Sequence, residues 1–198
     1  MTTVLLERVT GSALEPYLDD LAALRIEVFR EFPYLYDGDP AYERRYLSTY
    51  AASARSLCVL ARDGGSVVGA ATGIPLEDET EEFTAPLKTE GLDIRETFYF
   101  GESVLRCSYR GQGIGAGFMR EREAYAREQG FRQLMFCAVQ RPDDHPRRPR
   151  DYRPLDAFWE SRGFRRHPRL VTWYRWRDLD DVEETRKPMA FWLKRLDD

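Results

Sequence analysis

Residues 109–118, YRGQGIGAGF, contain four glycines and one arginine within ten positions. Glycines at this density between a strand and a helix let consecutive backbone N–H groups close around a phosphate, and the positive amino-terminal end of the helix favours the anion. The pattern leaves four interpretations: a nucleotide-triphosphate loop, a dinucleotide loop, a coenzyme A loop, or a tight turn that binds no ligand.

Two of these interpretations lack a residue that their chemistry requires. A nucleotide-triphosphate loop ends in Gly-Lys-Ser/Thr, whereas Gly115 is followed by Ala116 and Gly117. Gly111-x-Gly113-x-x-Ala116 formally satisfies the dinucleotide pattern, but that fold places an acidic residue at the end of the next strand, about 20 positions on. That strand ends in CAVQRP, without an acid, which disfavours a nicotinamide-binding oxidoreductase.

The coenzyme A interpretation is supported by a family resemblance that covers essentially the whole chain. The segment 110–115, RGQGIG, resembles the Arg/Gln-x-x-Gly-x-Gly/Ala pattern of the acetyl-CoA loop in the GNAT superfamily of N-acetyltransferases. The preceding ESVLRCSYRG is similar to the family's Glu-Leu-x-Val-x-Pro-x-Tyr-Arg-Gly, with Ser103 and Cys107 in place of leucine and proline. Further on, YRPLDAFWESRGF keeps the Gly-Phe ending of a second family signature but has Trp159 where tyrosine is usual.

The resemblance implies an enzyme that moves the acetyl group of acetyl-CoA to an amine of a small molecule or a protein, by direct attack on the thioester in a ternary complex. It also implies that backbone N–H groups of Val104 and Leu105 hold the pantetheine arm and polarise the thioester carbonyl. The predicted acetyl-CoA contacts lie on the strand end, the loop and a later helix: Val104, Leu105, Arg106, Arg110, Gly111, Gln112, Gly113, Ile114, Gly115, Ala116, Phe158 and Trp159.

Glu102 is the candidate general base, acting directly or through a water, with Glu96 in reserve. Strand periodicity places Glu102 and Val104 on one face of the strand, with Ser103 and Leu105 on the other. Burial raises the pKa of a carboxyl group toward values that are useful for a base. In the alternative interpretation, Glu102 pairs with an arginine and is structural.

The general acid departs from the family pattern, because the indole N–H of Trp159 cannot deliver a proton at neutral pH. Either the thiolate leaves without help, or a tyrosine supplies the proton. Tyr152 is the first candidate and Tyr109 the second.

The acceptor pocket in this family is usually lined by the region between the first two helices and by the late strands. Here that region is EFPYLYDGD, so Tyr34 and Tyr36 are the predicted substrate-binding residues, with Asp37 nearby for a cationic amine. The arginine-rich segment 141–153 is a candidate lid over the site or contact for the 3′-phosphate of coenzyme A, and disorder is an equal alternative.

The elements that must position these residues follow from periodicity and from turn residues. Strands are predicted over 2–10, 56–62, 66–76, 97–108, 131–139, 169–178 and 188–196, and helices over 13–32, 41–53, 113–130 and 155–163. Segment 77–94 is predicted as an acidic loop with a short helix. We therefore expect an α+β fold in a single domain, 1–198, with a mixed sheet and flanking helices. The family resemblance implies in addition that the twisted sheet is mostly antiparallel and that its central strands are splayed.

Composition limits the partners. A net charge of −4 and a pI near 5.4 argue against nucleic acid as the main partner. The amino terminus has no signal-peptide pattern, no apolar run is long enough to span a bilayer, and the three cysteines are interpreted as reduced thiols, with Cys107 and Cys137 in the core. We expect a cytoplasmic protein without a metal site, for which a homodimer is a candidate assembly. A catalytically silent coenzyme A-binding sensor, or an enzyme using another acyl donor or an oxygen acceptor, are the remaining alternatives.

Overall fold

A seven-stranded sheet in the order β1-β2-β3-β4-β5-β7-β6 runs through the computed structural model, which describes residues 4–196. All neighbouring strands are antiparallel except β4 and β5, which are parallel. The sheet is therefore mixed and mostly antiparallel, as predicted. The strands are β1 (Leu5–Thr10), β2 (Leu57–Asp63), β3 (Ser66–Pro75), β4 (Thr97–Leu105), β5 (Gln133–Val139), β6 (Arg165–Trp176) and β7 (Thr185–Arg195).

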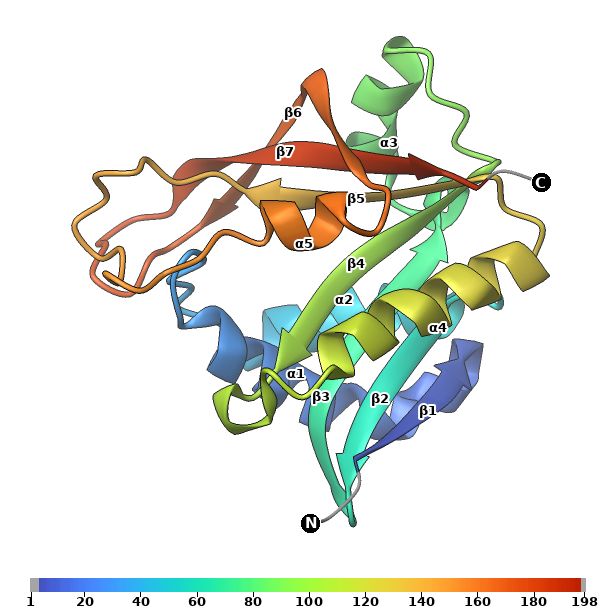
Figure 1. Ribbon diagram of the computed structural model, residues 1–198, viewed down its shortest axis with the longest axis horizontal. Coiled ribbons are helices and arrows are strands. Elements are labelled where there is room, and N and C mark those ends of the chain that lie inside the picture. Colours follow the sequence, from blue (N-terminus) through green and yellow to red (C-terminus); the bar gives the residue numbers. More distant parts are fainter. Residues whose placement is uncertain (1–3, 197–198) are drawn as a thin grey trace.

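Helices cover both faces of the sheet (Figure 1). Helices α1 and α2 lie behind the sheet in this view, and α4 and α5 lie in front of it. Within residues 4–196 the α-helices are α1 (Leu18–Phe29), α2 (Pro40–Ala52), α3 (Glu81–Thr89), α4 (Ile114–Glu128) and α5 (Asp156–Glu160). The short 3-10 helices are η1 (Gly11–Tyr17), η2 (Leu76–Asp78) and η3 (Cys107–Tyr109). This arrangement confirms the α+β class.

Two apolar clusters, one on each face, form the core. Leu21 of α1, Leu47 of α2 and Val104 of β4 belong to the first cluster. Phe118 of α4 and Phe98 of β4 belong to the second. Strand β4 therefore contributes side chains to both clusters and lies between the two helical layers.

The helix predicted over 13–32 is divided in the structure. Its first part is the 3-10 helix η1, which contains Pro16, and the α-helix begins only at Leu18. Proline has no backbone N–H and disfavours a regular α-helix around it, which accounts for the division. The first strand, predicted over 2–10, begins at Leu5, and residues 2 and 3 lie outside the described residues.

The start of α2 is encoded locally. Asp39 is the N-cap, and its Oδ1 accepts a hydrogen bond from the Tyr42 backbone N–H at 2.6 Å. Pro40 occupies the first turn, where its fixed φ suits the helix and no N–H is needed. This cap fixes the point at which the chain leaves the 33–39 segment and enters the helix.

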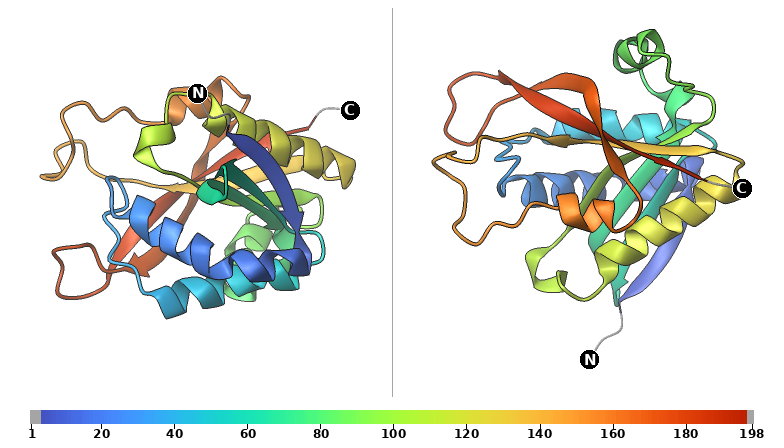
Figure 2. Two further views of the ribbon diagram at one scale, coloured as in Figure 1. Left: turned by 90° about the horizontal axis from the view of Figure 1, so that it is seen from below. Right: turned by 45° about the horizontal axis from the view of Figure 1, so that its top comes forward.

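Strands β4 and β5 separate soon after they meet. Their parallel pairing covers only Thr97–Tyr99 of β4 against Gln133–Met135 of β5. Beyond that point the two strands diverge: β4 runs toward the start of α4, and β5 stays beside β7 (Figures 1 and 2). The predicted splay of the central strands is present, and the carboxyl half of β4 has no strand on its β5 side.

None of the helices within residues 4–196 combines the length and apolar character that crossing a bilayer requires.

Candidate active site

The glycine loop, residues 110–115, has the backbone conformation that its sequence predicts. Gly111 and Gly113 have φ values of 76° and 82°, a region that other residues rarely adopt. A Cβ added at either position would meet no atom within 4 Å, so the space in front of the loop is open. The glycines are thus required by backbone conformation, and the loop presents its main chain to that space.

Helix α4 begins at Ile114, so the last two residues of the loop belong to its first turn. The first intrahelical bond is donated by the Gly117 N–H to the Gly113 carbonyl at 3.0 Å, so the preceding amides, Ile114 to Ala116, have no acceptor within the helix. Helix α4 has 15 residues, and its dipole adds positive potential at this end. Loop and helix end together provide the donors that a pyrophosphate requires.

The basic side chains of the loop contact α1 and the segment that follows it. Arg110 donates to the Leu105 carbonyl at 3.1 Å and pairs with Glu31 at 2.6 Å. Arg106 pairs with Glu27 at 3.1 Å. These ion pairs are exposed and therefore weak, which leaves both guanidinium groups able to exchange a carboxylate for a phosphate.

Strand β4 contains a bulge between Phe100 and Ser103. Ala71 of β3 is opposite Ser103 and Gly73 is opposite Phe100, so β4 has one residue more than β3 over this stretch. The extra residue reverses the alternation of side chains. Phe98 and Phe100 face α4, but Val104 packs on the α1–α2 side, as does Glu102, which contacts α1.

The bulge also determines which β4 amides point away from β3. The Arg106 N–H donates to the Val68 carbonyl at 3.1 Å, so the ladder makes Val104 and Ala70 a hydrogen-bonded pair. The Val104 N–H is therefore turned toward β3, whereas the N–H groups of Ser103 and Leu105 point toward the splay. Of the two predicted amide donors, the Leu105 N–H faces the splay and the Val104 N–H faces β3, and the Ser103 N–H faces the splay beside that of Leu105.

Glu102 is buried on the α1–α2 side and is paired with an arginine. Arg25 of α1 contacts Glu102 Oε2 at 2.5 Å and also forms a close ion pair with Glu43 of α2. Burial lowers the pKa of Arg25, but the charges of Glu102 and Glu43 outweigh burial and raise it well above its ordinary value. The Tyr46 hydroxyl donates to the same Glu102 oxygen at 3.4 Å. The pairing that the alternative interpretation of Glu102 foresaw is therefore present.

Arg122 of α4 supports β4 at the bulge from the opposite face. Its guanidinium donates to the carbonyls of Thr72 at 3.1 Å and Glu102 at 3.2 Å, and to the Ser103 hydroxyl at 2.7 Å. It also lies over the Phe100 ring at 4.1 Å, and burial lowers its pKa to about 9. These bonds satisfy main-chain carbonyls that the irregular pairing leaves without regular ladder partners.

The two tyrosine candidates for the general acid, and Trp159 at the position where the family has tyrosine, lie in different places. Tyr109 donates to Asp63 at 2.7 Å, near the turn between β2 and β3. Trp159 is partly buried and packs edge-on against Phe136 and Trp192 of the second core cluster. Tyr152 packs edge-on against Phe32 with the ring centroids 4.7 Å apart, and partial burial raises its pKa. Of these residues, Tyr152 contacts the segment 31–39, which is predicted to bind the acceptor.

Phe158, on α5, lies close to the glycine loop. Its ring would be 3.9 Å from a Cβ added at Gly115. Helix α5 therefore brings Phe158 to the start of α4, while its neighbour Trp159 is turned into the core.

Tyr34 and Tyr36 are partly buried on the α1 side. The Tyr34 ring lies between Phe29 and Trp176, at centroid distances of 4.4 and 5.9 Å. Its pKa is raised by burial and by the nearby Cys137 thiol. The pKa of Tyr36 is raised by burial and by the charge of Glu43. Their hydroxyl groups thus face the buried side chains that surround Glu102.

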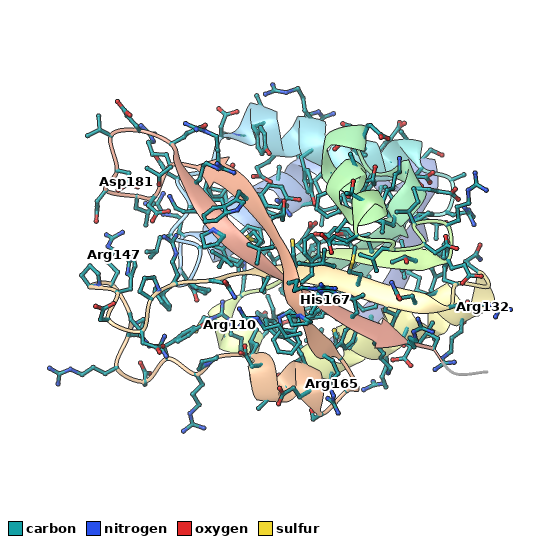
Figure 3. The ribbon with its side chains drawn as sticks, turned by 90° about the horizontal axis from the view of Figure 1, so that it is seen from above. Arg110, Arg132, Arg147, Arg165, His167 and Asp181 are labelled. Atoms are coloured by element: carbon teal, nitrogen blue, oxygen red, sulfur yellow. The ribbon has the colours of Figure 1, made fainter. Side chains whose placement is uncertain are left out.

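Arg141, from the arginine-rich segment, fixes this part of the chain. Its guanidinium donates to the carbonyls of Pro33 at 2.7 Å and Tyr34 at 2.8 Å and pairs with Asp178 at 2.8 Å. Farther along the segment, Arg147 pairs with Asp180 at 2.5 Å. Figure 3 shows Arg147 and Asp181 at the same end of the molecule, and a cavity of about 360 Å³ lies there, lined by His145, Arg147 and three aspartates.

Sequence reasoning missed a second acidic side chain near Glu102. Glu79 follows η2 and accepts a hydrogen bond from the Tyr50 hydroxyl at 3.5 Å. Burial raises its pKa to about 7, and the Glu102 charge contributes. Glu79 lies in the acidic run 77–82, which resembles a surface loop in the sequence, so no local signal separates it from its neighbours.

The cysteines differ from the prediction at one position. Cys58 and Cys137 are buried and reduced, and the Tyr99 hydroxyl lies 3.1 Å from the Cys137 sulfur. Cys107 is exposed, which corrects its assignment to the core, because β4 ends at Leu105 and Cys107 begins η3. Among the described residues, no three His, Cys, Asp or Glu side chains are grouped so that they could hold a metal ion.

Comparison with known families identifies the class of protein. The family model "Acetyltransferase (GNAT) family" matches residues 21–164, and the chain belongs to this family, whose members transfer acetyl groups from acetyl-CoA to an acceptor. A search of curated proteins gives no match.

Solved structures share the fold along nearly the whole chain. They include a ribosomal-protein-alanine N-acetyltransferase from Brucella melitensis, with 18% identity, a TM-score of 0.61 and coverage of 97% of this chain and 99% of that one. An IAA acetyltransferase from Bacillus cereus ATCC 14579 has 17% identity, a TM-score of 0.55 and coverage of 98% and 100%. An N-acetyltransferase from Staphylococcus aureus Mu50 has 13% identity, a TM-score of 0.62 and coverage of 98% and 99%. At these identities the likeness shows the fold.

Proposed function

We propose that the protein transfers the acetyl group of acetyl-CoA to an amine in a ternary complex. The observation that carries the proposal is the open glycine loop at the start of α4, beside a β4 strand that has no partner strand on its β5 side. Acetyl-CoA supplies an activated thioester, and the chain supplies sites for its pyrophosphate and for its carbonyl. The family match supports acetyl transfer, and the two acceptor-side tyrosines support an amine.

On the donor side, the residues act through their main chain. The amides of residues 111–116 would hold the pyrophosphate, with Arg110 adding charge. The outward N–H groups of Ser103 and Leu105 would hold the pantetheine arm and stabilise the charge that develops on the thioester oxygen. Phe158 would pack against the bound cofactor beside Gly115.

On the acceptor side, the amine must lose a proton before it can attack. Glu102 remains the proposed base, because it is the carboxylate of β4 on the face where Tyr34 and Tyr36 gather. Arg25 holds its side chain in one position. Tyr152, next to Phe32 and this group of tyrosines, is the proposed proton donor to the leaving thiolate.

Calorimetry with acetyl-CoA and with NAD, followed by thiol release measured across a panel of amines, tests the proposal. Acetyl-CoA binding without NAD binding, together with amine-dependent thiol release, is the expected result. Binding of acetyl-CoA without thiol release for any amine would favour the silent sensor. Binding of NAD alone would exclude both.

A further inference from the structure

We propose that a chain of four hydrogen-bonding side chains carries the proton of the acceptor amine from the active site to solvent: Glu102, Tyr46, Tyr50 and Glu79. This inference rests on the proposed acetyl transfer and adds to it a route for the proton. The route begins at the candidate base and ends at a carboxylate on a different element.

The four side chains form a continuous series. The Tyr46 hydroxyl lies 3.4 Å from Glu102 Oε2 and 2.9 Å from the Tyr50 hydroxyl. The Tyr50 hydroxyl lies 3.5 Å from Glu79 Oε1. Tyr46 and Tyr50 are one helical turn apart on α2, so the helix itself places the two hydroxyl groups next to each other.

Glu79 is suited to the end of this series because it combines proximity to the interior with partial exposure. Burial raises its pKa to about 7, so it can take up a proton at neutral pH and release it. The groups that face it are Tyr46 and Tyr50 of α2, Glu102 of β4, Cys137 of β5 and Tyr174 of β6, and its own carboxylate accepts from the Thr80 backbone N–H. Glu102 is the one carboxylate among these groups, and its charge adds to the rise in the pKa of Glu79.

The tyrosines act as neutral carriers. Burial raises the pKa of both Tyr46 and Tyr50 well above the ordinary value, so neither holds a negative charge on its own. Each hydroxyl can instead accept one proton on its oxygen while it donates its own to the next group. The Tyr46–Tyr50 bond permits donation in either direction, which such a transfer requires.

The proton balance is complete with these groups. An N–H bond of the ammonium breaks and an O–H bond forms on Glu102. One proton then shifts from Glu102 to Tyr46, one from Tyr46 to Tyr50, and one from Tyr50 to Glu79. At the end both tyrosines are neutral, Glu102 is again a carboxylate beside Arg25, and Glu79 carries the proton until it passes to water.

The β4 bulge holds the centre of the relay in place. A Cβ on Gly101 would lie 2.1 Å from the Tyr50 hydroxyl and 2.5 Å from Thr72 Oγ1, so only glycine permits this close approach. Thr72 Oγ1 also accepts from the Glu102 N–H at 3.2 Å and bonds to the Tyr50 hydroxyl. The irregularity that orients Glu102 thus also positions Tyr50.

The first test replaces the end of the relay. Glu79→Gln is compared with Glu77→Gln, which makes the same change at an exposed residue of η2 that pairs with Arg55. With an amine that the native enzyme acetylates, we expect native kcat/KM to fall as the pH falls below about 7. Glu79→Gln should lower kcat/KM at pH 7 about tenfold or more and abolish this pH dependence. The kcat/KM of Glu77→Gln, and the acetyl-CoA Kd of both variants by calorimetry, should stay within about twofold of the native values.

The second test interrupts the relay in its middle. Tyr46→Phe and Tyr50→Phe each remove one hydroxyl and should lower kcat/KM at pH 7 as Glu79→Gln does, whereas Tyr42→Phe, on the exposed part of α2, should not. Far-UV circular dichroism and thermal melts identify folded variants.

The two proposals fail in different ways. If folded Glu79→Gln keeps the native rate and pH profile, the relay is overturned and acetyl transfer stands. If the native protein releases no thiol with any amine, the proposed function fails and the relay fails with it.

Discussion

The glycine loop and the buried polar cluster around Arg25 (Arg25, Glu43, Tyr46, Tyr50, Glu79 and Glu102) are built on opposite principles. The loop uses six consecutive residues, exposed backbone and glycines with positive φ. The cluster uses side chains from α1, α2, β4 and the segment after η2, and ion pairs and hydrogen bonds hold them together. The donor site is thus local and open, and the acceptor side is assembled from distant parts and closed.

This difference determines how each region responds to mutation. A buried carboxylate depends on its partner, because an unpaired charge in the interior is costly. An exposed loop depends on its backbone conformation and loses little when a surface ion pair is removed. We therefore expect large stability effects in the cluster, and effects mainly on binding in the loop.

Arg25→Met gives the largest expected effect. It leaves Glu43 and Glu102 buried without their cation, and we expect the free energy of unfolding to fall by about 3–5 kcal/mol in urea denaturation. Arg44→Met, which removes an exposed pair with Asp19, is the control and should cost less than about 1 kcal/mol. A loss below about 1 kcal/mol for Arg25→Met would show that the cluster does not depend on its cation.

Glu79→Gln sharpens the comparison through pH. The folded-state pKa of Glu79 is raised from 4.5 to about 7, so native stability falls as the pH rises through this interval. The variant lacks this loss. We expect the free energy of unfolding of the variant to equal that of the native protein near pH 4 and to exceed it by up to about 3 kcal/mol at pH 8. Denaturation curves recorded at each pH measure this difference. A constant difference between the two proteins across this range would contradict the raised pKa.

Gly113→Ala tests the loop. The φ of 82° makes alanine unfavourable by about 1–2 kcal/mol, and movement of the loop should weaken acetyl-CoA binding about tenfold or more in calorimetry. Gly130→Ala is matched, because Gly130 has a φ of 81°, open space for a Cβ and a place beyond the other end of α4. It should lose similar stability and keep the acetyl-CoA affinity. Equal affinity for both variants would separate the loop from acetyl-CoA binding.

Arg110→Gln gives the smallest expected change in stability, less than about 1 kcal/mol, because its pair with Glu31 is exposed. Acetyl-CoA binding should weaken severalfold, with a larger effect at low salt than at high salt. Calorimetry at two salt concentrations measures the acetyl-CoA affinity of the variant and of the native protein. If Arg110→Gln weakened acetyl-CoA binding by the same factor at both salt concentrations, the charge of Arg110 would not contribute to binding.

The same difference explains what could be predicted from the sequence. The fold class and the conformation of the glycine loop follow from strand periodicity, the helix pattern and residues 110–115, all of which are local. The splay of β4 and β5 was expected only because the chain resembles a family that has it. The pairing of Glu102 could be anticipated only as an alternative, because Arg25 is far away in the sequence. Cys107 was misplaced because the end of β4 depends on where η3 begins.

The bulge accounts for two features of the site that the sequence does not reveal. The direction of the Val104 N–H follows from pairing with β3, and no pattern within β4 specifies that register. Glu79 was passed over for a similar reason. Its environment is produced by α2 and β4, and the acidic run in which it lies is uniform in sequence.

The additional residue in β4 has a consequence for comparing this chain with its relatives. It divides the strand into two segments, one before Gly101 and one after it. Even-numbered side chains face α4 in the first segment and face α1 and α2 in the second. A shift of the second segment by one residue would exchange its two faces, so that Gly101 or Ser103 would take the place of Glu102 on the side where Arg25 lies. An alignment of relatives in this strand should therefore keep the extra residue between Phe100 and Ser103. A glutamate aligned with Glu102 without it can lie on the other face of the sheet.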